Sequence, residues 1–387
     1  MEPHEQARHR RVDLLGELVT IPSVNPLQAG ERSGPGGEQA MAERVAELAD
    51  GLGADVLLDE VEAGRPNVYA TFPGSGAGHV VVDVHIDTVG VEHMEGDPFS
   101  GECRDDRVYG RGAVDTKASL AVVFDLMERV RAGHHTLGPT LTVVGTVAEE
   151  AGGLAGAHRF HEWAQERRLH VDRIVVAEPT MCAPVHGHKG GVGLEITVRG
   201  TAAHSSRPEL GRNAIRGAAR IIEAFDTEHE RLVSGPADTA VGPGTLSVTQ
   251  IGGGLARNII PDQCWLYAGR RTAPGEDPDA VFAALAALAI DAAEGLEVEV
   301  EKTYGRGSPA FYQDPDAAIV TDLADWAGSE PTTATYGSNA LVYPDIADGV
   351  VVFGPGSIDQ AHGAVEWVTV DELDRAAAVY QRWLTEA

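Results

Sequence analysis

Five segments of the sequence place a carboxylate or an imidazole directly after an apolar run or in a turn before a helix. His85 and Asp87 follow the run VVVDV at 80–84. Alternate residues of a β-strand face the same way, so this spacing predicts that both side chains point in one direction at the end of a buried strand. The other members are Asp115 in the turn GRGAVDTK, Glu149 and Glu150 after TLTVVGTVA, Glu178 after DRIVVA, and His362 in GPGSIDQAH.

Taken singly, these residues have common structural explanations. A histidine after a strand is usually a hydrogen-bonded structural residue, and Asp115 has the position of a helix cap. Adjacent glutamates are usually solvated, but Glu149 and Glu150 close an apolar strand, where like charges are costly unless a cation compensates them. Strand ends of α/β sheets are also where ligands bind. Two histidines with several carboxylates therefore indicate zinc or a similar divalent metal, and a pair of ions bridged by one carboxylate.

Other catalytic chemistries find no motif in the sequence. There is no G-x-S-x-G serine elbow and no HExxH zinc motif. The segment FPGSGAGH does not match G-x-G-x-x-G, and GRGAVDTKAS lacks the glycine that precedes lysine in a P-loop. The sequence thus offers no candidate for a serine hydrolase or for nucleotide binding.

The composition limits the partners and the compartment. The net charge of −29 argues against nucleic acid and against anionic membrane surfaces, both of which repel an acidic protein. Three separated cysteines indicate reduced thiols in a cytoplasmic protein rather than a disulfide framework. The first residues lack the apolar core of a secretory signal, and no run approaches the roughly 18 apolar residues that a membrane span needs.

The elements that must position the five segments follow an α/β pattern. Valine- and isoleucine-rich strands alternate with amphipathic helices, which indicates a mixed, mostly parallel sheet covered by helices. We expect helices at 5–19, 36–53 and 118–133, and strands at 54–59, 67–72, 79–86, 140–148 and 172–178.

The pattern changes near residue 188. Strand 191–199, helix 211–227, strands 245–251 and 262–271, helix 277–293 and strand 297–303 follow the ferredoxin-like β-α-β-β-α-β order. A helix near 316–327 and a strand at 349–354 then resume the first pattern. We therefore expect an α/β catalytic domain formed by 1–187 and 304–387, interrupted by a lid and dimerisation domain at 188–303.

Ten motifs, in an order that spans nearly the whole chain, carry a family resemblance. The chain resembles the acetylornithine deacetylase, succinyl-diaminopimelate desuccinylase and carboxypeptidase superfamily of two-zinc amidohydrolases, and it is most similar to the acetylornithine deacetylase branch. The motifs are IPSVNP (21–26), HIDTV (85–89), GRGAVDTK (110–117), EE (149–150), AEPT (177–180), HKG (188–190), AHSSRPELGRNAI (203–215), RNIIPD (257–262), RTAPGE (271–276) and GPGSIDQAH (354–362).

The resemblance implies a role for each matching residue. His85 and Glu178 would bind one metal ion, Glu150 and His362 the other, and Asp115 would bridge both. Asp87 would orient His85 by a hydrogen bond, and Glu149 would act as general base. In the inserted domain, His204 would stabilise the oxyanion across a homodimer. Asn258 and Arg271 would hold the free carboxylate of the substrate, and Asn339 would lie near its side chain.

The implied reaction is the removal of an N-acyl group from an N-acyl-L-amino acid. A hydroxide that bridges two divalent ions, zinc or else cobalt, would attack the amide carbonyl with the help of Glu149. Asn339 stands where relatives often carry an acid, which would pair with a cationic substrate side chain. The resemblance makes acetylornithine the first candidate, and because asparagine pairs less strongly with a cation than an acid does, another N-acyl amino acid or a dipeptide is the alternative. A one-metal enzyme and a non-catalytic binding protein with the same fold are further alternatives.

Overall fold

The computed structural model describes residues 3–235 and 240–385, which form two compact units. Unit 1 consists of residues 1–186, 313–332 and 338–387, and unit 2 of residues 187–312 and 333–337, apart from the residues outside the described ranges. The chain passes between the units within or beside three short strands, β8 (Val185–His188), β15 (Phe311–Tyr312) and β16 (Thr332–Ala334). The predicted inserted segment, 188–303, lies within the larger part of unit 2.

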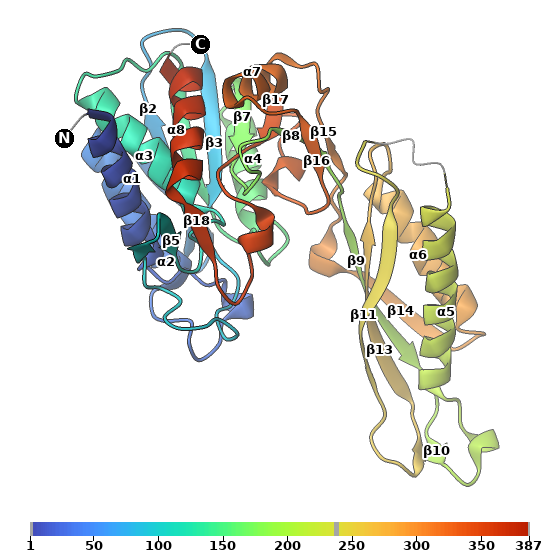
Figure 1. The fold of residues 1–387 in the computed structure, drawn as a ribbon. Helices are drawn as coiled ribbons and strands as arrows, with labels where there is room; N and C mark the ends of the chain where they lie inside the picture. Colours follow the sequence, from blue (N-terminus) through green and yellow to red (C-terminus); the bar gives the residue numbers. More distant parts are fainter. Residues whose placement is uncertain (1–2, 236–239, 386–387) are drawn as a thin grey trace. The chain divides into compact units, whose positions relative to one another are not determined.

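A mixed sheet forms the centre of unit 1 (Figure 1). Its strands lie in the order β1-β2-β6-β3-β7-β17-β8, and the pairs β6–β3, β3–β7 and β7–β17 are parallel. The central strands are almost continuous apolar runs because both of their faces are covered. The predicted mixed, mostly parallel sheet is confirmed. The strand bounds are β1 Asp55–Glu62, β2 Arg65–Phe72, β3 His79–His85, β6 Thr140–Thr146, β7 Val171–Val176 and β17 Ala347–Val352.

Helices pack on this sheet, and three of them, α1, α3 and α8, lie side by side (Figure 1). A buried ion-pair network joins these three helices, because Arg11 of α1 pairs with Asp125 of α3 and with Asp374 of α8. Helix α8 was not among the predicted elements, although its apolar residues recur at helical spacing. The helix bounds are α1 Pro3–Val19, α2 Gly37–Leu52, α3 Lys117–Arg131, α4 Ala155–Glu166, α7 Ala318–Ala327 and α8 Val370–Thr385.

A small sheet that the sequence analysis missed joins two distant parts of unit 1. Strand β5 (Arg107–Tyr109) pairs with β4 (Cys103–Arg104) on one side and with β18 (Trp367–Thr369) on the other. These three strands are only two or three residues long, so none of them has a recognisable alternation of apolar and polar residues. The pairing brings Glu366, which directly precedes β18, close to the turn that contains Asp115.

Unit 2 has the predicted β-α-β-β-α-β order. Its four antiparallel strands lie in the order β11-β13-β9-β14, and α5 and α6 pack on one face of the sheet (Figure 1). A separate short pair, β10 with β12, extends beyond the start of β13. The bounds are β9 Val192–Arg199, β10 Ala203–His204, α5 Ala214–Val233, β11 Thr245–Gly253, β12 Ile259–Ile260, β13 Gln263–Arg271, α6 Pro278–Ala292 and β14 Glu297–Lys302.

Short 3-10 turns complete the described structure. They are η1 Pro26–Gln28, η2 Pro208–Leu210, η3 Thr303–Gly305, η4 Asn339–Leu341 and η5 Ile358–Gln360. The three cysteines are free thiols. Among the helices of the described residues, none is both long enough and apolar enough to cross a membrane.

Candidate metal centre

The carboxyl ends of three parallel strands bring the predicted ligands of unit 1 to one edge of the sheet. Strand β3 ends at His85 itself, and β7 ends two residues before Glu178. Strand β6, which lies beside β3, ends at Thr146, so that the following loop carries Glu149 and Glu150. Because neighbouring parallel strands end on the same side, side chains that are far apart in the sequence meet here.

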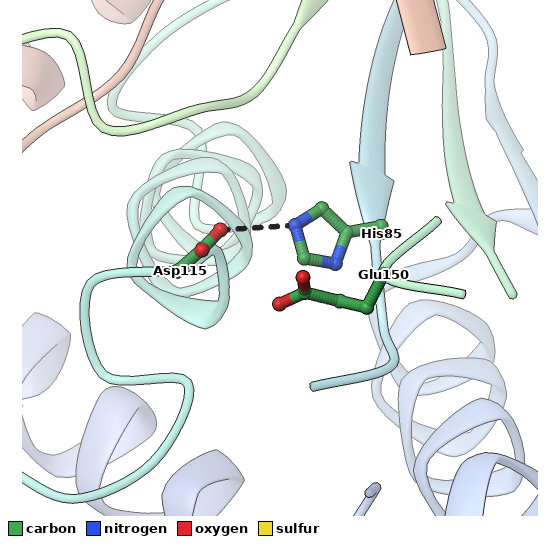
Figure 2. A group of neighbouring side chains, drawn as sticks. All are labelled: His85, Asp115 and Glu150. Carbon is green, nitrogen blue, oxygen red and sulfur yellow. Dashed lines mark hydrogen bonds and ion pairs between the residues drawn. The ribbon is translucent and has the colours of Figure 1, made fainter. Parts of the chain in front are cut away.

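Asp115 lies between the two predicted histidine ligands. Its Oδ1 is 3.0 Å from Nε2 of His85, and its Oδ2 is 3.2 Å from Nε2 of His362. His362 is also 3.1 Å from the carboxylate of Glu150. Figure 2 shows His85, Asp115 and Glu150 directed toward one another. A carboxylate with one oxygen toward each histidine has the arrangement that a bridging ligand requires.

Two overlapping groups of possible metal ligands share His85. Ligand atoms of His85, Asp115 and Glu150 lie within 4.8 Å of one another, and so do those of His85, Glu149 and Glu178. The Oε1 atom of Glu178 is buried and has no hydrogen-bond partner in the described structure. A buried carboxylate oxygen is costly without a partner, and imidazole with carboxylate donors suits zinc. The residues therefore fit divalent metal ions.

The electrostatics of the cluster also favour a cation. Burial, together with the charges of Glu150 and Asp87, raises the pKa of Glu149 to about 8 although His85 opposes the shift. Burial and the charge of Asp115 raise the pKa of Glu178 well above its usual value. Burial has the same effect on the pKa of Glu150. Carboxylates whose ionised forms are disfavoured in this way are stabilised when a positive charge lies among them.

Contacts between the two histidines and Asp115 favour the ionised forms of all three side chains, in contrast to the three glutamates. Hydrogen bonds that His362 donates to Asp115 and Glu150 raise its pKa to about 10. Burial lowers the pKa of His85, but the neighbouring carboxylates, Asp115 first among them, together outweigh it and raise this pKa well above its usual value. Although burial opposes it, contact with the two histidines lowers the pKa of Asp115. The ion pairs thus hold Asp115 ionised, which a metal ligand must be.

The position of Asp87 differs from the prediction. Strand β3 ends at His85, so the alternation of a strand does not extend to Asp87. The Nδ1 atom of His85 donates to the backbone carbonyl of Asp87 at 2.9 Å, whereas the carboxylate oxygen is 3.7 Å away. That carboxylate instead accepts hydrogen bonds from the backbone N–H groups of Glu149 and Glu150, both at 3.1 Å. Asp87 therefore orients the histidine through its main chain and the two glutamates through its side chain.

A buried glutamate that the sequence analysis missed supports Asp115. Glu366 is 1% exposed, pairs with the buried Arg111, and accepts hydrogen bonds from the backbone N–H groups of Val114 and Asp115 at 3.1 and 3.3 Å. Its partners lie more than 250 positions away, so no local spacing in the sequence points to this contact.

The predicted substrate residues of unit 2 fall into two places. His204 of β10 pairs in register with Ile259, the neighbour of Asn258, so these two predicted residues are close together. The Nδ1 atom of His204 lies 2.7 Å from the hydroxyl of Ser206, and its side chain is exposed. Arg271 is the last of the nine residues of β13, and the β10–β12 pair lies beyond the first residue of that strand. At the usual rise per residue, the length of the strand places Arg271 roughly 26 Å from the pair.

Asn339, which is predicted to contact the substrate, lies in a buried part of unit 1. It belongs to unit 1, its exposed fraction is 1%, and its Nδ2 donates to the hydroxyl of Thr146 at 2.9 Å. Thr146 in turn donates to the buried Asp83, which also accepts a hydrogen bond from Tyr343. The side chain is thus part of a buried network beneath the end of β3, and almost none of its surface is available to a substrate.

The fold and the cluster together are those expected of a metal-dependent hydrolase, with the candidate ligands at one edge of an α/β sheet. The model of Peptidase family M20/M25/M40 matches residues 81–386. An acetylornithine deacetylase from Myxococcus xanthus is 31% identical over 331 residues, which is 84% of this chain and 85% of that protein. The chain therefore belongs to this family and is a hydrolytic enzyme.

Solved structures share the fold at lower identity. The di-peptidase Dug1p from Saccharomyces cerevisiae superposes with a TM-score of 0.79 and 14% identity, covering 99% of this chain and 97% of that one. The YXEP protein of Bacillus subtilis, described as a dinuclear metal-binding peptidase from the M20 family, superposes with a TM-score of 0.68 and 16% identity over 97% of both chains.

Proposed function

We propose that the protein removes the acyl group from an N-acyl-L-amino acid and that it uses two divalent metal ions, for which zinc is the first candidate. The observation that carries this proposal is the convergence of two histidines and four carboxylates at one edge of the sheet. The six residues are His85, Asp115, Glu149, Glu150, Glu178 and His362. Their types match a binuclear hydrolytic site, and the family membership of the chain supports the same reaction class.

In this proposal His85 and Glu178 would hold one ion, Glu150 and His362 would hold the other, and Asp115 would serve both. Bound divalent ions polarise an amide carbonyl and lower the pKa of water.

The remaining steps belong to side chains of the protein. Glu149 accepts the proton of the attacking water and returns it to the nitrogen of the leaving amine. His204 donates a hydrogen bond to the developing oxyanion. A protein that only binds its ligand would have no use for a carboxylate in the position of Glu149.

The substrate panel that tests this proposal consists of N-acetyl, N-succinyl and N-formyl amino acids together with dipeptides, each assayed with zinc and with cobalt. We expect kcat/KM for N-acetylornithine to exceed that for the other compounds by at least about tenfold, since the named relative is an acetylornithine deacetylase. A preference for dipeptides would favour the alternative substrate class. No cleavage of any compound by metal-loaded protein would contradict the proposed reaction.

The distance within unit 2 supports a homodimer. Asn258 precedes the first residue of β13, and Arg271 is its last residue. If both bind the same substrate carboxylate, as we propose, they must come from two copies of the chain. Strand β11 offers a surface for this association because it is an edge strand of its sheet and because Ile251 is 53% exposed on it.

We expect the purified protein to have twice the 40.8 kDa mass of the chain in light scattering coupled to size exclusion. The variant Ile251→Asp should shift it toward the monomer, since it places a charge in the proposed contact. Leu57→Asp serves as the control, because Leu57 is an exposed residue of unit 1. A monomeric wild-type protein at micromolar concentration would contradict the dimer.

The cytoplasmic location stays a prediction.

A further inference from the structure

The loop that carries Glu149 and Glu150 is held by side chains from other segments. Four successive backbone N–H groups, those of residues 147–150, each donate to a side-chain oxygen. The acceptors are Asn67 for Val147, Glu38 for Ala148, and Asp87 for both Glu149 and Glu150. Two carbonyls are held as well, that of Glu150 by Gln28 and that of Ala151 by Asn25.

Among the three residues that accept these N–H groups, Glu38 lies farthest in the sequence from the loop. Its side chain is 1% exposed, and one carboxylate oxygen accepts from Ala148 N–H and from Arg65, both at 2.9 Å. The other oxygen accepts from Nε of Arg65, whose side chain is 9% exposed. A buried charge pair of this kind is costly to desolvate, so it adds little to stability by itself. The pair fixes the carboxylate in one orientation toward the loop.

The backbone at this position needs such a restraint. Ala148 has a φ of +62°, a left-handed conformation that is unfavourable for a residue with a Cβ. Asn67 holds the preceding residue and also donates to the carbonyl of Gly156 at 2.8 Å. Any side chain at Gly156 would approach within 2.3 Å of the carbonyl oxygen of Val147. The entry to the loop is therefore fixed from α2, from β2 and from the start of α4.

We propose that Glu38, held by Arg65, and Asn67 are positioning residues that fix the direction of the Glu149 carboxylate by clamping the backbone of residues 147–148. This inference rests on the proposed function, in which Glu149 transfers the proton. Glu38 does not touch the substrate or the metal ligands in this scheme. Its effect is on the geometry of proton transfer, for which a displacement of about 1 Å can cost 100-fold in rate.

The variant Glu38→Gln tests the clamp. Glutamine keeps the size of the side chain, but it can no longer accept from both Arg65 and Ala148 with two charged oxygens. We expect kcat on the best substrate to fall about 10- to 100-fold with KM changed less than about threefold, and two metal ions per chain to remain. Hydrogen exchange of the amides of residues 147–150 should be at least about tenfold faster than in the wild type.

A matched control separates positioning from a general loss of stability. Asp125→Asn removes a carboxylate that is equally buried and also paired with a buried arginine, Arg11, but that contacts helices rather than the loop. We expect this variant to lower the melting temperature while kcat and the exchange of residues 147–150 stay at wild-type values. Asn67→Ala provides a second test of the clamp should Glu38→Gln not fold.

The outcomes distinguish the two proposals. A wild-type protein that cleaves no amide contradicts the proposed function, and the exchange measurement then still tests the clamp. Unchanged exchange of residues 147–150 in Glu38→Gln overturns the clamp in every case. An active wild type with an unchanged kcat in Glu38→Gln overturns it as well, and so does an equal loss of kcat in Asp125→Asn.

Discussion

The variant Glu149→Gln should lower kcat on the best substrate by about 10²- to 10⁴-fold, the usual contribution of a general acid–base group. The amide of glutamine has nearly the shape of the carboxylate, but it cannot accept a proton from water or return one to the leaving amine. The ion content should stay at two per chain, since His85, Asp115, Glu150, Glu178 and His362 remain. Steady-state kinetics and elemental analysis of the same preparation check both expectations.

Two variants serve as controls for this prediction. Glu162→Gln changes an exposed glutamate of helix α4 and should leave kcat unchanged. Glu150→Gln changes the adjacent residue, which contacts His362; it should reduce the metal content as well as the rate. If Glu149→Gln retained the wild-type kcat, Glu149 would not be the base. If it lost metal to the same degree as Glu150→Gln, Glu149 would be a ligand instead.

Several candidate residues of the metal centre could be found from the sequence because they lie at places that local patterns define. His85, Glu149 and Glu178 follow apolar runs that end at the same edge of a parallel sheet. Because parallel strands end at the same edge of the sheet, polar residues that directly follow the strands in the sequence lie close together in space. Asp115 and His362 lie in glycine-containing turns, where the pattern is weaker, and the role of every one of these residues was predicted from the resemblance to a family.

The residues that hold the ligands could not be found in this way. Glu38, Asn67 and Glu366 act on the backbone of segments that are 80 to 252 positions away. A glutamate in the first turn of an amphipathic helix is ordinarily solvated or caps the helix, and nothing in its neighbourhood distinguishes Glu38. The resemblance implied that the Asp87 side chain binds His85, whereas in the structure the main-chain carbonyl of Asp87 makes that contact.

Asn339 shows a related limit. The sequence marks it as a polar residue near a family motif, but burial decides its role, and burial depends on the packing of η4 against the end of β6. In unit 2 the order of the elements was predictable from alternation and helical spacing. The separation of Asn258 from Arg271 required the strand pairing, since only the register of β10 with β12 shows that the chain continues away from β13.

Removal of the metal ions should abolish activity and lower the stability of unit 1. Without cations, four carboxylates share one buried site, and their mutual repulsion and desolvation oppose the folded arrangement. A ligand that binds only the folded state stabilises it by about 4 kcal/mol when its free concentration is 1,000-fold above Kd. We therefore expect protein treated with a chelator and then freed of it to melt at a lower temperature and to lose at least about 10³-fold in kcat/KM.

Re-addition of metal provides the decisive comparison for the same experiment. Zinc or cobalt should restore both the melting temperature and the rate, with a stoichiometry of two ions per chain if Asp115 bridges them. Asp115→Asn keeps the shape of the side chain but loses the charge that both histidines contact, so it should bind fewer ions and recover no activity. A stoichiometry of one ion in a fully active wild type would replace the two-metal site with a one-metal site. Full activity in metal-free protein would contradict metal-dependent hydrolysis itself.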